Sequence, residues 1–489
     1  MTRIHEFVFR SVYNEIASEE NGTCRVTQLM DGCHADSKTV NLTQLKNLIP
    51  KILRATQGFH LNVVTLPSSI RDHECKSLKI IRLKTAVVEA NFDWTFVRIE
   101  SDEGISGLGE CFFAPGLTSI LRSLESLLRG EDPRDVHRLF RKLRLATSGA
   151  GSSAGIIYNA ISGIEAALWD LLGQSLGVPI HRLLGGKFRD KVRIYADCHG
   201  SEALECLDNV LRSRPARWLS HESTHVAKDY FGAGHDEPAS TPAEYKQRAL
   251  EKKAEGFTAL KFDLDVPGTY AADPHSRALS NRAIDHAVSL IGAVREAVGV
   301  ETEIAVDCHW RYSASDVIRV AHELEPCRLL WLEDPVPPDS VAALMEVSAK
   351  VRVPIATGEN LFLFEGFEEI IAKHAISIVT PDLQKVGGLA IAQSIAQFAD
   401  VHTMPVAPHN ISSPVGTLLS AHFCAAIPNF LALEFHGSDV PFWNDLVEGL
   451  PKPIIQDGFI RVPEKPGLGV TLNEEVTRRY ARKGEPFFE

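Results

Sequence analysis

The chain of 489 residues carries 51 Lys and Arg against 63 Asp and Glu, a formal net charge of −12. Its length suits roughly two to four domains, or one large barrel with additional segments. The acidic balance disfavours a nucleic-acid ligand, because phosphate backbones repel a negatively charged surface. Its apolar runs are interrupted by charge and fall short of the roughly 20 residues that span a bilayer, so we expect no membrane partner.

The cysteines are odd in number and widely spaced, and no two form a C-x-x-C pair. This pattern argues against a disulfide framework or a structural zinc site. It predicts reduced thiols and a cytoplasmic protein. The nine positions are Cys24, Cys33, Cys75, Cys111, Cys198, Cys206, Cys308, Cys327 and Cys424.

Residues 1–78 differ from the rest of the chain, because they mix polar residues with scattered apolar ones and show little sustained period. The segment lacks the order of charged, apolar and small residues of a secretory signal, and its acidic residues argue against a transit peptide. We interpret it either as an appended, partly ordered segment of unknown role or as a misread gene start.

A strand meander opens the folded part. The β-rich runs 80–90 and 94–101 are predicted strands, and the second ends at the turn Asp102-Glu103-Gly104. Helices are predicted over 119–128 and 160–172, the latter followed by Gly177 and Pro179, which end helices.

From the predicted strand at 192–200 to about residue 435, helical segments alternate with short β-rich segments. Alternation of this kind predicts parallel strands with crossover helices. Two long loops, 212–242 and 266–282, interrupt the rhythm and are typical of lids or binding loops. The loose spacing of His221, His225 and His235 in the first loop favours solvated side chains over a metal site.

A series of polar residues lies after successive short apolar segments at nearly constant spacing. The intervals are 333 − 307 = 26, 359 − 333 = 26, 382 − 359 = 23, 409 − 382 = 27 and 434 − 409 = 25. One strand plus one helix accounts for each interval, so these side chains should lie at the same end of successive strands. In a (β/α)8 barrel that end carries the active site. The residues are Asp307, Glu333, Glu359, Asp382, His409 and Glu434.

The first three members of the series are carboxylates without a thiolate or histidine among them. Asp307, Glu333 and Glu359 would repel one another in a partly dry cleft, and a divalent cation would remove that repulsion. Hard oxygen ligands suit Mg²⁺, with Mn²⁺ as a substitute. A solvated loop carboxylate explains any one of them alone, but equal spacing favours a shared metal site.

His409 and Asp382 come from neighbouring units of the series. An aspartate next to a histidine fixes the tautomer of the ring and raises its basicity. The pair is therefore predicted to act as a general base. Since a histidine in a Pro-rich turn is usually structural, this interpretation depends on the shared position in the series.

Several separated motifs, in order, resemble the enolase superfamily, its mandelate racemase subgroup, and within it the acid-sugar dehydratases of the galactonate and gluconate type. The resemblance covers about residues 79–470. It rests on the motifs ESDEGISGLGE, AALWDLLGQSLGVPIHRLLGG, ALKFD, VDCHW, WLEDP, TGENL, TPDLQKVGG, APHNISSP and LEFHG.

The resemblance implies a modified (β/α)8 barrel with an α+β capping domain and a C-terminal segment that returns to the cap. The expected domains are the appended segment 1–78, the cap 79–190, the barrel 191–440 and the C-terminal segment 441–489. Cap loops near residues 91–94 and 112–117 should close over the barrel. A homo-oligomer is also implied.

The resemblance also assigns roles. Asp307, Glu333 and Glu359 would bind the metal, and His409 with Asp382 would remove the proton α to a carboxylate. Glu434 resembles the acid that hydrogen-bonds the substrate carboxylate. His309, which shares a strand face with Asp307 by alternation, resembles the general acid acting on the leaving hydroxyl.

The strand motif Lys261-Phe262-Asp263 departs from the Lys-x-Lys of the subgroup's racemases. An aspartate occupies the position of their second base, so two-base racemisation is disfavoured and elimination, which needs one base and one acid, is favoured. We expect Lys261 and Asp263 to bind substrate. A surface lysine at a strand end is the alternative for Lys261.

The leading hypothesis is thus a Mg²⁺-dependent lyase that dehydrates a sugar acid to a 2-keto-3-deoxy acid. An epimerase, racemase or cycloisomerase on the same scaffold is one alternative, and a non-catalytic barrel that serves as a binding protein is another. The sequence does not name the sugar acid. A single histidine base favours substrates with an R centre at C2, as the resemblance implies.

Overall fold

The computed structural model divides the chain into two compact units, Met1–Lys76 and Ser77–Glu489. In the first unit the structure describes only strands β1 (Thr23–Cys24) and β2 (Val40–Asn41), which pair antiparallel. The roles considered for residues 1–78 therefore lie largely outside the described part. In the second unit the structure describes residues 78–150, 153–198, 216–218, 239–266, 268–269 and 276–489.

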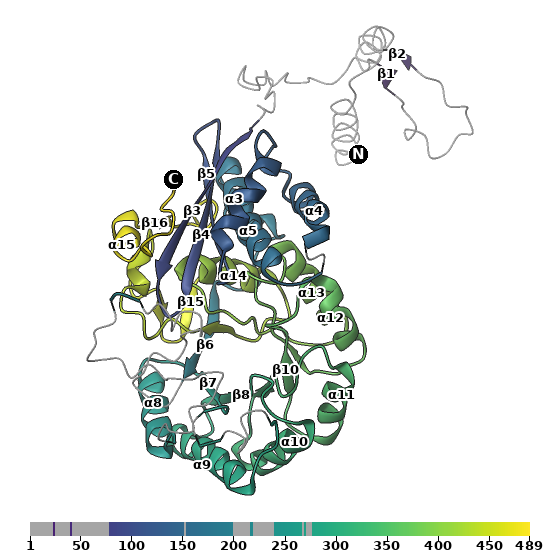
Figure 1. The fold of residues 1–489 in the computed structure, drawn as a ribbon, viewed down its shortest axis with the longest axis vertical. Helices are drawn as coiled ribbons and strands as arrows, with labels where there is room; N and C mark the ends of the chain where they lie inside the picture. Colours follow the sequence, from purple (N-terminus) through teal and green to yellow (C-terminus); the bar gives the residue numbers. More distant parts are fainter. Residues whose placement is uncertain are drawn as a thin grey trace, which may run out of the picture. The chain divides into compact units, whose positions relative to one another are not determined.

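The amino-terminal part of the second unit is an antiparallel meander covered by helices (Figure 1). Helix α5 packs closely on strand β5, because glycines line the contact. A Cβ atom on Gly107 would lie 2.0 Å from the carbonyl oxygen of Ala167, and one on Gly109 would lie 2.2 Å from that of Gly163. The elements are β3 (Ile80–Glu89), β4 (Asp93–Ser101), β5 (Ser106–Cys111), α3 (Leu117–Leu128), α4 (Val136–Ala146), α5 (Ile156–Leu176) and α6 (Ile180–Leu183).

Parallel strands alternating with helices form the next part, as predicted. Pairing runs in the order β6, β7, β8, β9, β10, β11, and single bridges continue it through Val406 to Phe430. Strand β12 then pairs with β6, which confirms the barrel fold class. The strands are β6 (Lys191–Cys198), β7 (Ala259–Asp263), β8 (Glu303–Asp307), β9 (Trp331–Glu333), β10 (Ile355–Thr357), β11 (Ile378–Val379) and β12 (Leu433–Phe435).

The outer helices begin at residues that satisfy free backbone N–H groups. Thr241 forms a capping box with Glu244, and Ser280 accepts from the N–H of Ala283. These caps end the two predicted loops slightly earlier than expected, at 241 and 280. His221, His225 and His235 lie outside the described residues. The helices are α8 (Pro242–Ala254), α9 (Asn281–Val298), α10 (Ala314–Glu323), α11 (Val341–Lys350), α12 (Leu363–Ala372), α13 (Leu389–Val401) and α14 (Pro414–Ala426).

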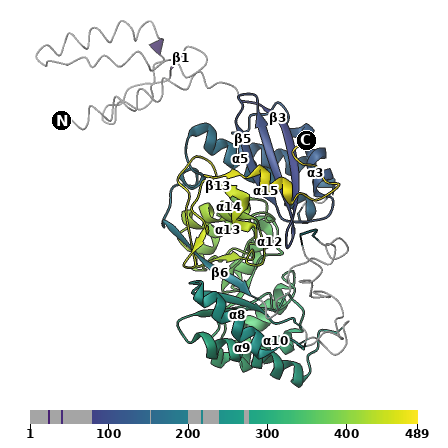
Figure 2. The same cartoon turned by 90° about the vertical axis from the view of Figure 1, so that its left-hand side faces the viewer.

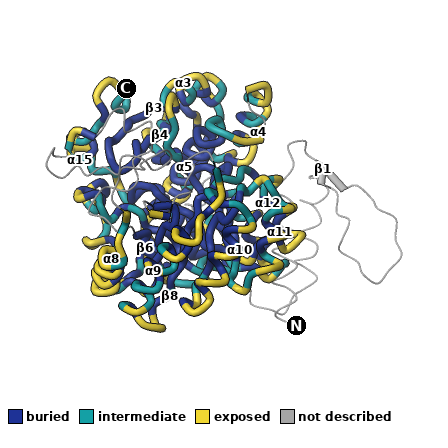
Figure 3. Tube along the Cα trace, turned by 60° about the horizontal axis from the view of Figure 1, so that its bottom comes forward, coloured by how far each residue is buried: buried dark blue, intermediate teal, exposed yellow. Residues whose placement is uncertain are grey.

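A separate cluster of buried residues fills the interior of the barrel, and each strand or bridged segment of the barrel contributes one residue to it. Most of its members are alanines, and the two large side chains Tyr195 and Trp331 meet edge to face with ring centroids 5.2 Å apart. Because side chains alternate along a strand, the residue two positions after each member of this cluster faces the same interior. The buried strands and exposed helix edges are visible in Figure 3.

The C-terminal segment returns to the cap. Strand β15 pairs antiparallel with β6, while Ala481 and Phe487 form bridges to Val88 and Ala86 of β3. Figure 2 shows α15 beside the cap strands. The elements are η3 (Trp443–Leu446), β13 (Val447–Glu448), β14 (Ile455–Gln456), β15 (Phe459–Arg461), β16 (Thr471–Leu472) and α15 (Glu474–Arg479).

Two buried glutamates of the cap bind the amino-terminal ends of barrel helices. Glu110 of β5 accepts hydrogen bonds from the N–H groups of Ser413 and Gly416 at the start of α14. Glu165 of α5 accepts from the N–H groups of Leu389 and Ala390 at the start of α13. A carboxylate there satisfies free N–H groups and complements the helix dipole. These contacts fix the cap on the barrel.

Among the described helices, none has the length and apolar character needed to cross a membrane. The five cysteines with described side chains, Cys111, Cys198, Cys308, Cys327 and Cys424, are free and buried. The predicted domain boundaries, the homo-oligomer and the cytoplasmic location stay predictions.

Candidate active site

All six members of the predicted series lie at the carboxyl ends of the barrel strands and are buried. Asp307 and Glu333 are the last residues of β8 and β9, and Glu434 is the middle residue of β12. Glu359, Asp382 and His409 come two or three residues after their strand positions. Because parallel strands end at the same edge, the series converges on one region.

Asp307, Glu333 and Glu359 form a carboxylate cluster in which one oxygen atom of each residue lies within 4.8 Å of the other two. The Nε1–H of Trp331 donates to Oε2 of Glu333 over 2.8 Å, while Oε1 of Glu333 has no hydrogen-bond partner among the described residues. Burial, together with neighbouring carboxylates, raises the pKa of Glu333 well above its usual range. A cation bound among these carboxylates would favour the ionised form of Glu333.

Lys261 points from β7 into this cluster and is 3% exposed, which excludes the surface alternative. Its Nζ lies 2.7 Å from Oε1 of Glu434, 3.0 Å from Oδ2 of Asp307 and 3.5 Å from Oε2 of Glu333. The ammonium offsets one of the negative charges of the carboxylate cluster. Glu434 is held further by the N–H of Asn410, which donates to its Oε2.

His409 lies between two carboxylates. Its Nδ1 is 2.7 Å from Oδ2 of Asp382 and its Nε2 is 3.2 Å from Oε2 of Glu359. The N–H of Gln384 donates to the other oxygen of Asp382, which fixes that side chain. Burial lowers the pKa of His409, but the surrounding carboxylates outweigh burial and raise it to about 10.

His309 faces the same region from the loop after β8. Its Nδ1 lies 2.8 Å from Oδ1 of Asp265 and 4.0 Å from Oδ1 of Asp263, and its Nε2 lies 3.8 Å from Oδ2 of Asp307. Burial opposes the charged ring, but the three aspartates outweigh it and raise the pKa of His309 well above its usual range. Burial also raises the pKa of Asp263 well above the usual range.

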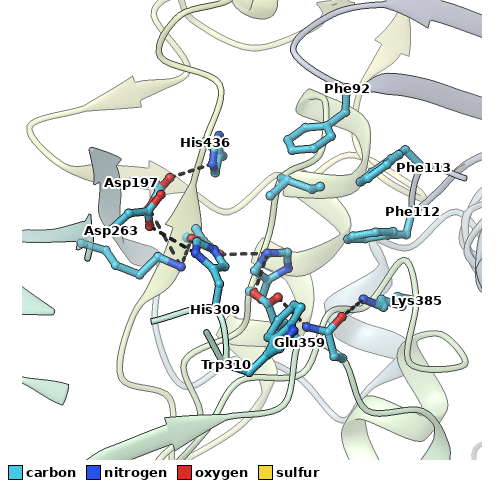
Figure 4. A pocket seen from close by; sticks show the side chains of 15 residues that line it. Phe92, Phe112, Phe113, Asp197, Asp263, His309, Trp310, Glu359, Lys385 and His436 are labelled. Carbon is cyan, nitrogen blue, oxygen red and sulfur yellow. Dashed lines mark hydrogen bonds and ion pairs between the residues drawn. The ribbon is translucent and has the colours of Figure 1, made fainter. Parts of the chain in front are cut away.

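A pocket between the cap and the barrel joins these groups. His309 and His409 line it together with Lys261, Asp263 and Glu434. The cap supplies Phe92, Phe112 and Phe113, which confirms that both predicted cap loops reach the barrel opening (Figure 4).

Sequence reasoning missed several residues at this pocket. Asp265 lies two positions after Asp263, and His436 lies two after Glu434, so the alternation that located His309 would have found both. Asp197 lies within the predicted strand at 192–200 and pairs with His436. Lys385 lies in the TPDLQKVGG motif, where its Nζ donates to Oδ1 of Asn360 over 2.6 Å and lies 4.4 Å from the Phe112 ring centroid. No spacing argument distinguishes this lysine from a solvated one.

The geometry defines a barrel with a carboxylate cluster and two histidines at its strand ends, covered by an α+β cap. Models of two known domains match the chain: the mandelate racemase / muconate lactonizing enzyme N-terminal domain over residues 79–185, and the enolase C-terminal domain-like family over 244–476. The chain belongs to the mandelate racemase / muconate lactonizing enzyme family of the enolase superfamily.

Named relatives include a D-xylonate dehydratase of Haloferax volcanii, 38% identical over 88% of this chain and 94% of the relative. A D-galactonate dehydratase of Ralstonia pickettii is 30% identical over 82% of this chain and 93% of the relative. Among solved structures, a mandelate racemase/muconate lactonizing enzyme-like protein from Rubrobacter xylanophilus has a TM-score of 0.76 at 41% identity. It covers 84% of this chain and 100% of its own.

Proposed function

We propose that the chain is a Mg²⁺-dependent sugar-acid dehydratase, a hydro-lyase that converts a polyhydroxy acid to a 2-keto-3-deoxy acid. The observation that carries the proposal is the pair of histidines, His409 and His309, each bonded to its own aspartate and both lining one pocket beside the carboxylate cluster. Elimination of water needs one base and one acid. The dehydratase names of the relatives support the same reaction.

Asp307, Glu333 and Glu359 fit a divalent cation. Each supplies a hard oxygen ligand, and Glu333 also has a buried Oε1 without a hydrogen-bond partner among the described residues. Bound Mg²⁺ would polarise the substrate carboxylate and stabilise the charge of the enediolate. Mn²⁺ suits the same ligands.

His409 would take the proton from C2. Asp382 holds its Nδ1, so Nε2 is the nitrogen that faces the substrate. Glu359 is one of the charges that raise the pKa of His409, and a cation on Glu359 would offset that charge. With that charge offset, the pKa of His409 would fall, so more of the ring would be neutral near pH 7 and able to accept the C2 proton.

His309 would protonate the departing C3 hydroxyl. Asp265 bonds its Nδ1, so Nε2 would deliver the proton, and the neighbouring Asp265 and Asp263 carboxylates favour the charged ring. Lys261 and Glu434, in contact over 2.7 Å, would bind the substrate carboxylate. The Lys261 ammonium stabilises the charge that develops there.

Asp263 occupies the position of a second base but carries a carboxyl group in contact with the cationic His309. This arrangement gives elimination the acid it needs and leaves two-base racemisation without its second nitrogen base. An epimerase would return a product without a new ketone, and a non-catalytic barrel would return none.

The deciding experiment is incubation of the full chain with Mg²⁺ and a panel of sugar acids that includes D-xylonate, D-galactonate and D-gluconate. Keto product is detected as its semicarbazone. Formation of a 2-keto-3-deoxy acid from at least one acid supports the proposal. Inversion at C2 without ketone would support the epimerase instead.

A further inference from the structure

Asp197, which is buried, and His436, which is partly exposed, form a pair on the side of the pocket away from Lys385 (Figure 4). Asp197 lies on β6 and His436 lies directly after β12, two strands that pair with each other. Nε2 of His436 lies 2.7 Å from Oδ2 of Asp197. The proton transfers proposed above use neither residue, although both line the pocket.

One oxygen of this pair has no hydrogen bond. Asp197 is 7% exposed, and its Oδ1 is buried without a hydrogen-bond partner among the described residues. The nearby Nζ of Lys261 lies 3.9 Å away and contacts Glu434 at 2.7 Å instead. A buried carboxylate oxygen without a donor is costly, so a donor supplied by a ligand would be bound strongly.

The cap holds the other member of the pair. Asn91, in the turn between β3 and β4, donates from Nδ2 to the backbone oxygen of His436 over 2.8 Å. The ring of Phe92 meets the imidazole edge to face, with centroids 5.8 Å apart. These contacts fix the imidazole against Oδ2 and leave Oδ1 as the oxygen of the pair without a hydrogen bond among the described residues.

We propose that the Asp197–His436 pair is a recognition site for a substrate hydroxyl beyond C3, with Oδ1 of Asp197 accepting the hydroxyl hydrogen. The inference rests on the proposed function, because His409 and His309 then fix C2 and C3 and direct the rest of the polyol chain along the pocket. The remaining hydroxyls of a sugar acid are hydrogen-bond donors. A site that binds one of them discriminates against an acid in which that hydroxyl is absent or inverted.

The test compares the full chain and Asp197→Asn on one sugar acid accepted by the wild type and on its 4-deoxy and 5-deoxy analogues, with Mg²⁺ and semicarbazone detection. We expect Asp197→Asn to lower kcat/KM for the parent acid about 10- to 100-fold, as loss of a charged hydrogen bond does. For one of the two deoxy analogues the loss should stay within about 3-fold, because that analogue lacks the hydroxyl.

His436→Gln provides a second variant that retains a side-chain donor for Asp197, and it should lower kcat/KM selectively for the same parent acid. Asp316→Asn, a buried carboxylate on helix α10 away from the pocket, is the matched control and should change all three substrates alike. Equal losses on parent and both analogues in Asp197→Asn, or no loss on the parent, would overturn the inference. No keto product from any acid with the wild type would overturn the proposed function and the inference with it.

Discussion

Nδ1 of His309 lies 2.8 Å from Oδ1 of Asp265. The second histidine of the pocket has the same construction, with Nδ1 of His409 2.7 Å from Oδ2 of Asp382. In both pairs the aspartate fixes the ring and leaves Nε2 for proton transfer. The proposed reaction assigns each oriented histidine one step, with His409 removing a proton and His309 delivering one.

Asp265→Asn should slow the delivery step. The variant removes the charge that orients His309 and raises its pKa, so we expect the rate of keto product formation to fall about 10- to 100-fold. Exchange of the C2 proton, measured by NMR in deuterium oxide, should continue. The control Asp316→Asn should form product at the wild-type rate, and a parallel loss of exchange in Asp265→Asn would contradict this role.

Glu333→Gln should weaken metal binding. It removes one negative charge from the carboxylate cluster, so affinity for Mg²⁺ should fall by more than the roughly 10- to 100-fold typical of losing an outer-shell partner. Turnover should fall with it. Titration calorimetry with Mg²⁺ measures the affinity, and EDTA should abolish wild-type activity until Mg²⁺ is restored. Normal turnover of the variant in EDTA would rule out the metal site.

Substitution of the two histidines should have different effects on proton exchange and on product formation. His309→Asn should still wash deuterium into C2 of a true substrate while forming little keto product, because the intermediate can only return to substrate. His409→Asn should show neither exchange nor product. The result requires that the proton on His409 exchanges with solvent before it returns. Persistent exchange in His409→Asn would show that Lys261 or another group is the base.

A chain that begins at His73 should fold and retain activity. Residues 1–76 form a compact unit of their own, and every residue of the predicted series lies beyond it. The truncated chain should match the full chain in kcat/KM and in melting temperature of the barrel transition. An insoluble or inactive product would show that the removed segment supports the barrel or the pocket.

Glu110 should make stability depend on pH. Burial, offset in part by hydrogen bonds from Ser413 and Gly416, raises its pKa from 4.5 to about 7. The native state then holds a proton that the unfolded state loses, so the contribution is present below pH 4.5 and is lost as pH rises through about 7. Over this window the change approaches about 3 kcal/mol.

Glu110→Gln removes this titration. The unfolding free energy of the variant relative to wild type should therefore rise between pH 4.5 and pH 8, as measured by urea denaturation at each pH. Glu475→Gln, an exposed carboxylate of α15, is the control for loss of one charge. Parallel curves for wild type and Glu110→Gln would show that Glu110 does not titrate in this range.

The barrel and its site could be predicted from sequence because the strand-plus-helix repeat places chemically distinctive residues at equal intervals. Asp307, Glu333 and Glu359 could be grouped without coordinates, since parallel strands end at one edge. The strand motif also places Lys261 at a strand end, although its contacts with three carboxylates depend on side-chain directions that spacing does not give. The family motifs added the cap and its closing loops.

The residues that sequence reasoning missed depend on contacts between distant segments. His436 meets Asp197 because β12 pairs with β6, and 239 residues separate the two (436 − 197). The bonds from Glu110 to the start of α14 likewise join the cap to a helix about 300 residues later. No local pattern marks such residues, since a buried carboxylate and a solvated one look alike in sequence.

The pairing of β3 with Ala481 and Phe487 has a consequence for synthesis on the ribosome. Domains generally fold as they emerge, amino terminus first, but the first sheet of this unit is completed by Ala481 and Phe487, which follow β3 by about 400 residues. We expect the cap over the pocket to form only after Phe487 has left the ribosomal tunnel. Pulse proteolysis of ribosome-bound chains of increasing length should find the β3–β4 turn cleavable until Phe487 emerges and protected afterwards.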